Sequence, residues 1–465
     1  MGTAYPDLGT PFVKETCFFM IEQVLQYLRE RKYAQVKAAA LNMHYADIAE
    51  VFARLDDDGD RESALLFFRL LPKELAAETF AYMEPDVQEH ILSAITDREL
   101  RFILDDLYLD DYVDLVEEMP ANVVKRVLRN SSGENRKLIN QYLQYPEDSA
   151  GSIMTNEYVY FKQSLTVRQA IENIRKTGID KETINTCYVI DNEHHLDGVV
   201  GLRELILADP DTVVGDIMRT HIICVHTHDD QEEVALMFSK YDMLSMPVVD
   251  NENRLVGIIT IDDVIDVMAD EATEDMEKMA AITPSDKPYL RTGVFETWKS
   301  RIPWLLLLMV SATFTSMILL RFEQALSTAL IAFIPMLMDT GGNSGSQSSV
   351  TIVRSISLGD VEFRDLPRVL WKEIRVALLC GITLAVCNFA KLLFFDRVGV
   401  AVATVVCCTL ICTVLFAKTV GCSLPMLAKR LGFDPAVMAS PFITTIVDAL
   451  SLVIYFQIAA LLLGL

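Results

Sequence analysis

Three carboxylates stand in or beside apolar stretches in the last third of the chain, where an ionisable group is costly. Asp448 lies in the run Thr444-Thr-Ile-Val-Asp448, and Asp339 and Asp434 lie nearer the ends of such runs. An acid in hydrocarbon must pair with a base, take up a proton, or face water and a cation. No Lys or Arg follows Asp434 in this sequence. Lys418, near the end of the preceding apolar run, is therefore the obvious candidate for a basic partner of Asp448. We therefore expect Asp448 to face a cation pathway, whereas Asp339 and Asp434 could equally be interfacial or capping residues.

A second anomaly is the segment Asp339-Thr-Gly-Gly-Asn343-Ser-Gly-Ser-Gln, which follows Pro335. Glycines and small hydroxyl residues allow helix backbones to approach closely, or they interrupt a helix and free its carbonyl groups. With a carboxylate in another apolar run, a polar pathway is the interpretation we favour. Thr444, one helical turn before Asp448, and Asn343 would supply further oxygen atoms.

Oxygen ligands without histidine suit a hard, hydrated divalent cation such as Mg²⁺, which gives up its water reluctantly and needs few protein ligands. The apolar runs contain no His, which disfavours selection of soft metals. This chemistry does not exclude Ca²⁺.

The elements that must position these groups are apolar runs at about 303–320, 325–338, 376–395, 398–417 and 436–464. Most approach the ~20 residues that cross a bilayer, and the second should continue to about residue 350. Five spans place the C-terminus opposite the N-terminus. Seven Lys and Arg residues flank the second and fourth connections and three flank the other two, which predicts a cytoplasmic N-terminus. We therefore expect a multi-pass protein of the cell membrane with the lipid bilayer as its surroundings.

The soluble part is strongly acidic. Residues 301–465 hold 12 Lys and Arg against 9 Asp and Glu, whereas the first 300 residues hold 29 against 56. Such a surface repels nucleic acid, so no nucleic-acid partner is expected, and it favours cations as ligands. A membrane enzyme would need a nucleophile and a base, such as Ser with His, in the spans, and that set is missing, so we do not expect an enzyme. A scaffold without transport would need neither Asp448 nor the glycine-rich segment.

Two further domains precede the apolar part. Residues 15–130 show apolar residues three and four apart, with Leu71-Pro72 and Met119-Pro120 before helical runs, which predicts stacked helical hairpins. Residues 150–270 contain an internal repeat: Val189-Ile-Asp-Asn-Glu returns as Val248-Val-Asp-Asn-Glu. Each unit reads helix, strand, turn, strand, helix, which predicts a small α/β module present twice. A charged connector, helical at its start, occupies 271–300.

With these motifs, the chain resembles the MgtE family of bacterial magnesium channels and transporters over almost its whole length. The matching stretches are His44-Tyr-Ala-Asp-Ile-Ala-Glu, Tyr145-Pro-Glu-Asp-Ser-Ala-Gly, Gly341-Gly-Asn-Ser-Gly-Ser-Gln, Val353-Arg-Ser-Ile-Ser-Leu-Gly-Asp and Thr444-Thr-Ile-Val-Asp448.

The resemblance implies a multidomain α, α/β and membrane-α architecture. It predicts an N-terminal α-superhelical domain (1–145), two CBS modules (146–211 and 212–272), a connecting plug helix (273–300) and a five-helix transmembrane domain (301–465). It also implies a homodimer with the pore on its twofold axis, Asp448 as the selectivity carboxylate and Thr444 as a neighbouring position. The implied function is Mg²⁺ uptake and homeostasis; a broader transporter of Co²⁺, Mn²⁺ or Ca²⁺ is the alternative.

The family keeps its pore shut when cytosolic Mg²⁺ is high, which makes physical sense because opposed carboxylates repel until a cation bridges them. The residues at the implied sensor positions are Asp106, Asp110, Asp230, Glu232, Asp242, Asp263, Asp266, Glu271 and Glu274. We expect Asp106 and Asp110 to lie one turn apart on a single helix. CBS modules often bind adenine nucleotides, and Thr260 and Asp263 of the second module suit phosphate and ribose contacts. The first module has Gly201 and Glu204 there and departs from the pattern, so ATP is expected at one module only.

Overall fold

The computed structural model describes residues 13–285, 289, 292–322, 328–438 and 440–463. The chain divides into two compact units between Val264 and Ile265.

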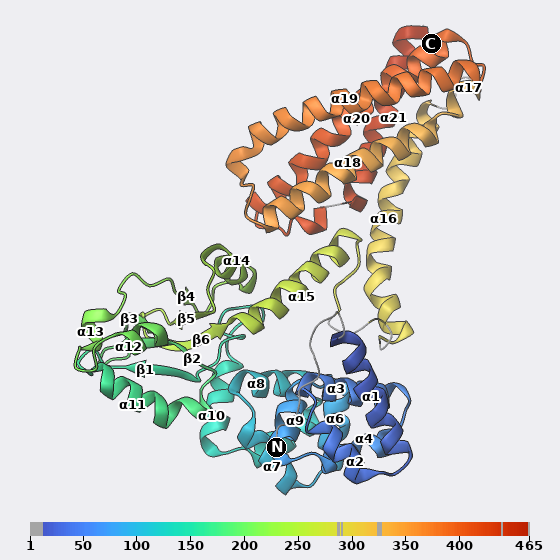
Figure 1. Ribbon diagram of the computed structural model, residues 1–465. Coiled ribbons are helices and arrows are strands. Elements are labelled where there is room, and N and C mark those ends of the chain that lie inside the picture. Colours follow the sequence, from blue (N-terminus) through green and yellow to red (C-terminus); the bar gives the residue numbers. More distant parts are fainter. Residues whose placement is uncertain (1–12, 286–288, 290–291, 323–327, 439, 464–465) are drawn as a thin grey trace. The chain divides into compact units, whose positions relative to one another are not determined.

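Short helices build the first part of the N-terminal unit (Figure 1). Residues at the N-cap position mark where several of these helices begin. Pro72 and Pro120 occupy that position, one residue before the first helical turn, and Thr96 forms a capping box with Glu99. Because apolar residues recur three and four apart, each helix buries one face, with Phe52, Phe67 and other large side chains in the shared core. The described helices are α1 (Val13–Arg29), α2 (Tyr33–Ala40), α3 (Tyr45–Asp57), α4 (Arg61–Leu70), α5 (Lys73–Ala81), α6 (Pro85–Ala94), α7 (Asp97–Asp106), α8 (Leu109–Glu118), α9 (Ala121–Asn130) and α10 (Gly133–Tyr142).

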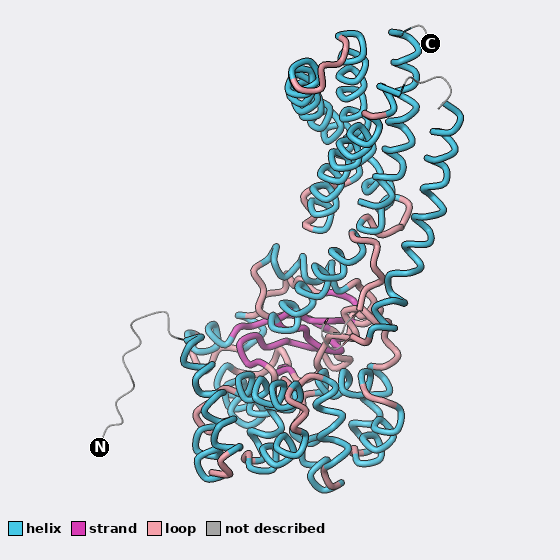
Figure 2. The backbone as a smooth tube through the Cα atoms, turned by 90° about the vertical axis from the view of Figure 1, so that its right-hand side faces the viewer, coloured by secondary structure: helices cyan, strands magenta, loops and turns pink. Residues whose placement is uncertain are grey.

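The sequence repeat folds as two small α/β modules, whose strands are the magenta segments of Figure 2. Each has a three-stranded sheet whose first two strands are parallel and whose last two are antiparallel. The first contains β1 (Tyr158–Phe161), α11 (Val167–Thr177), η1 (Gly178–Asp180), β2 (Thr183–Ile190), β3 (Leu196–Gly201) and α12 (Leu202–Leu207). The second contains α13 (Val214–Ile217), β4 (Val225–His226), α14 (Gln231–Tyr241), β5 (Ser245–Val249), β6 (Leu255–Thr260) and α15 (Ile261–Met279).

Backbone bridges link the two modules to each other. Thr155, which precedes the first sheet, bridges to Ile258 of the second, and Arg219, which precedes the second sheet, bridges to Val199 of the first. Tyr188 joins their shared core, where its hydroxyl lies 3.2 Å from that of Ser245. The modules therefore form one folded pair rather than two independent domains.

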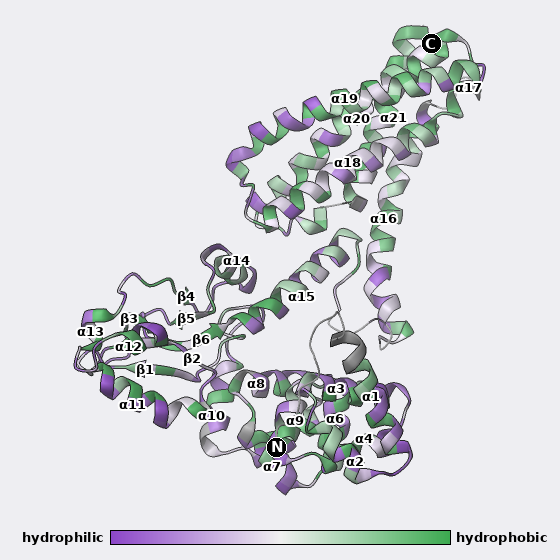
Figure 3. Cartoon of the chain, in the orientation of Figure 1, coloured by the Kyte–Doolittle hydropathy of each residue, from purple (hydrophilic) through white to green (hydrophobic). Residues whose placement is uncertain are grey.

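The second unit is helical, and its hydrophobic residues follow the helices from α16 to α21 (Figure 3). Besides the part of α15 from Ile265 onward, its elements are α16 (Val294–Phe322), α17 (Thr328–Ile331), α18 (Ile334–Ser357), η3 (Phe363–Asp365), α19 (Leu366–Phe394), α20 (Val400–Arg430), η4 (Ala436–Met438) and α21 (Ser440–Leu463). Within the described residues, four helical stretches are long and apolar enough to cross a membrane: Val294–Arg321, Phe363–Phe394, Val400–Arg430 and Ala436–Leu463. α18, with 24 residues, is the fifth long helix, but its Gly, Ser and Asn content keeps it out of that set.

Two clusters mark the two ends of this bundle. At one end, Leu330, Leu392, Ala403 and Tyr455 pack together, and the Tyr455 hydroxyl donates to the Leu330 carbonyl at 2.9 Å. At the other, the C-terminal halves of α18 and α20 meet the start of α19, in a cluster that includes Ile356. Successive long helices from α18 to α21 therefore run in alternating directions.

Candidate functional site in the helical bundle

Asp448 and Asp339 project from two helices that pack together, α21 and α18. Asp448 is half-buried, and its carboxylate lies within electrostatic reach of the exposed Asp339. Thr444 lies one turn before Asp448, donates its hydroxyl hydrogen to the Pro441 carbonyl at 2.9 Å, and faces Gly342 of α18. Two acids and a threonine thus line the contact between α18 and α21, a set of hard oxygen donors.

The glycines of α18 produce close packing, not a break. The helix is continuous through Gly341 and Gly342, so of the two consequences left open for this segment, close approach is the observed one. A Cβ atom at Gly341 would lie 2.9 Å from a Val447 methyl group, and one at Gly421 of α20 would collide with the carbonyl oxygen of Gly345. Only residues without a side chain allow α18 to lie this close to α20 and α21.

A polar stripe runs along the exposed side of α18. Asp339, Asn343 and Gln347 are four residues apart, and all three are exposed in the single chain. Residues at this spacing share one helix face. Asn343 therefore lies on the same face as Asp339, directly after the glycines that hold α18 against α21.

Lys418 does not pair with Asp448. It is 6% exposed, its ammonium group lies 3.9 Å from the Glu373 carboxylate, and it donates to the Ser348 hydroxyl at 3.2 Å. Ser348 donates in turn to Glu373 at 2.7 Å, so the three side chains join α18, α19 and α20. Among the described residues, no Lys or Arg forms an ion pair with Asp448. The sequence reasoning overlooked Glu373, although an acid and a base in neighbouring apolar helices were a signal for such a pair.

Asp434 is a capping residue and also one end of an ion pair. Its carboxylate accepts from the Ala436 backbone N–H at 2.7 Å, which confirms the capping interpretation, and it accepts from Lys278 at 2.7 Å. Lys278 also binds Glu274, one turn earlier on α15, at 2.7 Å. Although burial lowers the pKa of Lys278, the hydrogen bonds to Asp434 and Glu274 raise it above its ordinary value. The sequence analysis missed Lys278, because only the fold brings α15 to Asp434.

A neighbouring contact uses Asp275, whose carboxylate accepts from the Ser357 hydroxyl at 3.0 Å. Burial raises the pKa of Asp275, and this hydrogen bond works against the rise. Met279 packs on Val353 and Ala436 close by. The last turns of α15 are therefore joined to the end of α18 and to the segment around η4 by both polar and apolar contacts.

The first two predicted sensor residues occupy different helices. α7 ends at Asp106 and α8 begins at Leu109, just before Asp110, so the expectation of a single helix through both is wrong. Leu107 and Tyr108 adopt extended backbone angles that end the first helix and cap the second. The side chains of Asp106 and Asp110 lie outside the described residues.

The sensor candidates of the second CBS module have local backbone roles. Asp230 is the N-cap of α14 and accepts from the Glu232 N–H at 2.9 Å, and Asp242 ends that helix with φ of 51°. The others lie along α15, where Asp266 is exposed and Glu271 and Glu274 are partly buried. Within the described parts of the chain, no three or more His, Cys, Asp or Glu side chains are grouped closely enough to hold a metal ion.

Thr260 and Asp263, the predicted nucleotide contacts, do lie together. Thr260 ends β6, Asp263 lies in the first turn of α15, and the threonine hydroxyl donates to the carboxylate at 2.8 Å. In the first module, Glu204 folds back onto Gly201, where any Cβ atom would collide with its carboxylate. The second module thus presents a hydroxyl and a carboxylate at the end of its sheet. At the equivalent position of the first module, the Glu204 side chain fills this space.

A helical bundle with acids between its helices, preceded by a paired α/β module and a helical domain, is typical of a membrane protein that handles cations. Comparison with known families agrees. The MgtE family pattern, described as a divalent cation transporter, matches residues 334–458, the MgtE intracellular N domain matches 43–148, and CBS domains match 150–211 and 214–270.

The chain is similar to the "Magnesium transporter MgtE" of Thermus thermophilus, with 40% identity over 88% of this chain and 91% of the relative. The protein of that name from Bacillus subtilis is 31% identical over 95% of this chain and 96% of its own length. This chain belongs to the MgtE family of magnesium transporters.

Solved structures agree for the soluble part. A crystal structure of the soluble part of a magnesium transporter is 32% identical, with a TM-score of 0.51, and covers 55% of this chain and 99% of that chain. A second crystal structure, of the cytosolic domain of the Mg²⁺ channel MgtE in complex with ATP, is 36% identical, with a TM-score of 0.50. It covers 53% of this chain and 99% of that chain.

Proposed function

We propose that the protein conducts Mg²⁺ across the cell membrane through a pathway lined by Asp448, Thr444 and Asn343. The main support is Asp448 itself: it lies in an apolar helix, and among the described residues no base pairs with it. Such a carboxylate is costly unless water and a cation face it. Asp339 across the α18–α21 contact doubles the negative charge, and Mg²⁺ needs only a few carboxylates because it retains much of its water.

We further propose five membrane passes, with α18 as the second, a cytoplasmic N-terminus and the C-terminus on the opposite side. The alternating directions of α18 to α21 support this path. α18 crosses despite its polar stripe because a homodimer, with the pore on its twofold axis, would cover that stripe. A lipid-facing Asp339, Asn343 and Gln347 would be costly, whereas the same residues beside water and a second copy would not be.

The pathway is tested with purified protein in liposomes loaded with a Mg²⁺-sensitive dye. Asp448→Asn keeps the size of the side chain and removes the charge, so Mg²⁺ flux should fall at least about tenfold. Asp360→Asn is the matched control, because Asp360 is an exposed acid of the same domain. Flux in Asp448→Asn equal to that of Asp360→Asn, with both proteins folded, would remove Asp448 from the pathway. Parallel assays with Co²⁺, Mn²⁺ and Ca²⁺ separate Mg²⁺ selectivity from the broader alternative.

We infer that cytosolic Mg²⁺ closes this pathway by bridging acids of the soluble domains and the connecting segment, 273–300. The many carboxylates of the soluble domains and the connecting segment support this inference, because a bound cation favours the state in which opposed acids meet. Of the candidates, Glu271 and Glu274 lie on the helix whose last turns contact α18 and Asp434. Neutralising both should raise the Mg²⁺ concentration needed for closure. Gating that keeps its normal midpoint in the double variant would exclude them.

ATP is proposed as a ligand of the second CBS module, at Thr260 and Asp263. The hydroxyl and carboxylate pair supports this, as does the ATP complex formed by the related cytosolic domain. Thr260→Val should abolish an ATP-dependent rise in the melting temperature. An unchanged rise in that variant, or none in the parent protein at millimolar ATP, would contradict the assignment.

A further inference from the structure

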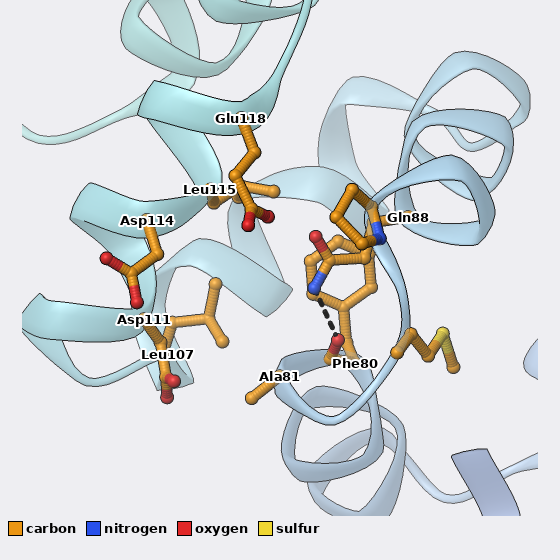
Figure 4. A pocket seen from close by; sticks show the side chains of 10 residues that line it. Phe80, Ala81, Gln88, Leu107, Asp111, Asp114, Leu115 and Glu118 are labelled. Atoms are coloured by element: carbon orange, nitrogen blue, oxygen red, sulfur yellow. Dashed lines mark hydrogen bonds between the residues drawn. The ribbon is translucent and has the colours of Figure 1, made fainter. Parts of the chain in front are cut away.

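α19 leaves one apolar face uncovered in the single chain. Its other side packs on α20, where a Cβ atom at Gly381 would lie 3.2 Å from the Cα atom of Ile411. The uncovered face carries exposed apolar side chains three and four residues apart, Leu379, Ile382 and Val386. By contrast, Phe80 and Leu115, which line a pocket of the N-terminal domain (Figure 4), are only 1% and 2% exposed. Because α19 is long and apolar enough to cross a membrane, lipid chains are the expected neighbours of its uncovered face.

The same face becomes basic toward the start of α19, where hydrophilic residues gather (Figure 3). The spacing of three and four continues back through exposed residues, Arg375, Lys372, Trp371 and Arg368. The Arg375 guanidinium lies 5.6 Å from the centre of the Trp371 ring, and its Nε–H donates to the Trp371 carbonyl at 3.2 Å. The stacking and the hydrogen bond orient the guanidinium and leave its two terminal NH₂ groups available to an acceptor.

Two of these cations have no acidic partner. Arg368 pairs with Asp365 at 3.2 Å, so its charge is compensated. Within the described parts of the chain, neither Lys372 nor Arg375 forms an ion pair. Glu373, between them in sequence, is turned into the bundle, where its side chain is 14% exposed and faces Lys418 instead. The basic end of the face therefore attracts an anion.

An anionic phospholipid fits both parts of this face. A phosphate group suits an oriented guanidinium beside a lysine ammonium group, and acyl chains suit the exposed apolar side chains. Trp371 lies between the two parts, where the headgroup and hydrocarbon regions of a bilayer meet. A soluble anion would use only the basic part, and a zwitterionic lipid carries a positive charge that opposes the two cations.

We propose that this face of α19 binds an anionic phospholipid, with its phosphate held by Lys372 and Arg375 and an acyl chain along Leu379, Ile382 and Val386. The inference rests on the proposed membrane passage of α19, which places its basic end at the cytoplasmic leaflet. It does not require that Asp448 conducts ions.

Trp371 can report on its own lipid neighbours. The chain has three tryptophans, so Trp298→Phe and Trp304→Phe together leave Trp371 as the only one. This full-length protein is placed in phosphatidylcholine bilayers that contain a small fraction of brominated phosphatidylglycerol or brominated phosphatidylcholine, and quenching of its fluorescence is measured. Each cation at a membrane surface favours an anionic lipid about fivefold, so the two should give phosphatidylglycerol an advantage of about 25-fold.

Variants of the same protein locate the binding. Lys372→Gln and Arg375→Gln should each lower the advantage of phosphatidylglycerol about fivefold, and together they should nearly abolish it. Lys391→Gln is the matched control, because Lys391 lies at the other end of α19 and pairs with Asp396. It should leave the quenching of Trp371 unchanged. Soluble glycerol phosphate should not displace the lipid, since it cannot use the apolar part of the face.

Four results would overturn the proposal: equal quenching by the two lipids, basic-end variants that behave like Lys391→Gln, displacement by glycerol phosphate, or no quenching by either lipid. The last result would mean that a second copy, or another covering surface, occupies this face of α19. Mg²⁺ flux measured in the same vesicles keeps the two proposals apart. Selective quenching without flux would support the lipid site while the transport proposal fails.

Discussion

The Lys278 bridge offers a direct test of how the end of α15 is held on the membrane domain. Its ammonium group lies 2.7 Å from both Glu274 and Asp434, but only the contact with Asp434 joins two different elements. Hydrogen bonds to charged groups contribute about 1.5–3 kcal/mol. The Asp434 side chain is 33% exposed, so solvent screening argues for the lower end of that range. About 1.5 kcal/mol corresponds to roughly a tenfold change in the equilibrium between the docked and released ends of α15.

A double-mutant cycle isolates this contact. Lys278→Met, Asp434→Asn and the double variant are compared by amide hydrogen exchange over residues 274–281 at low Mg²⁺. Asn still accepts a hydrogen bond at a cap, so the contact of position 434 with the Ala436 N–H should survive. Each single change should speed exchange about tenfold, and the double variant should add little.

A control removes an equivalent charge at the opposite end of the bundle. Lys391 pairs with Asp396 at 3.1 Å, and Lys391→Met should leave exchange in 274–281 unchanged. Additive effects of Lys278→Met and Asp434→Asn would mean that the two side chains act independently. That result would refute the bridge as the contact that holds α15.

Three further predictions concern packing and charge. Lys418→Met should destabilise the protein by about 3–5 kcal/mol by leaving Glu373 buried without its partner, and adding Glu373→Gln should recover most of the melting temperature. Gly421→Ala should cost about 1–3 kcal/mol because the new methyl group meets a backbone carbonyl of α18, whereas Gly399→Ala, with open space around it, should melt like the parent protein. Asp111→Asn should raise stability at pH 7.5 by at most about 3 kcal/mol, since the raised pKa penalises the ionised acid above about pH 6. That advantage should fade as the pH falls toward 4, and melting curves with the same difference at every pH would contradict it.

The repeated Asp-Asn-Glu motif, which follows a strand in each copy, predicted two α/β modules, because strand and turn signals are local. The backbone bridges between the modules were not predictable, since Thr155 and Ile258 are about a hundred residues apart in sequence. The single helix expected through Asp106 and Asp110 was wrong for a local reason: the backbone at Leu107 and Tyr108 is extended, and the apolar spacing alone did not reveal it.

The glycine-rich segment shows the same limit in the membrane domain. Its composition indicated either close packing or a broken helix, and the residues on α18 alone could not decide between them. The choice depended on what faces them: side chains of α20 and α21 occupy the space that a Cβ atom at Gly341 or Gly345 would need. A continuous helix keeps its backbone hydrogen bonds, and the small residues are used for contact instead.

The sequence by itself located the apolar runs that fold as α16, α19, α20 and α21, and it showed that Asp448 is an acid without a basic neighbour in its own helix, because both are properties of a single segment. Only the tertiary structure decided which charges meet. It brought Lys418 to Glu373 and Ser348 and Lys278 to Asp434, and it placed Asp448 within electrostatic reach of Asp339. Ion pairs between distant segments depend on how helices pack, and that packing is set by the contacts of the whole bundle.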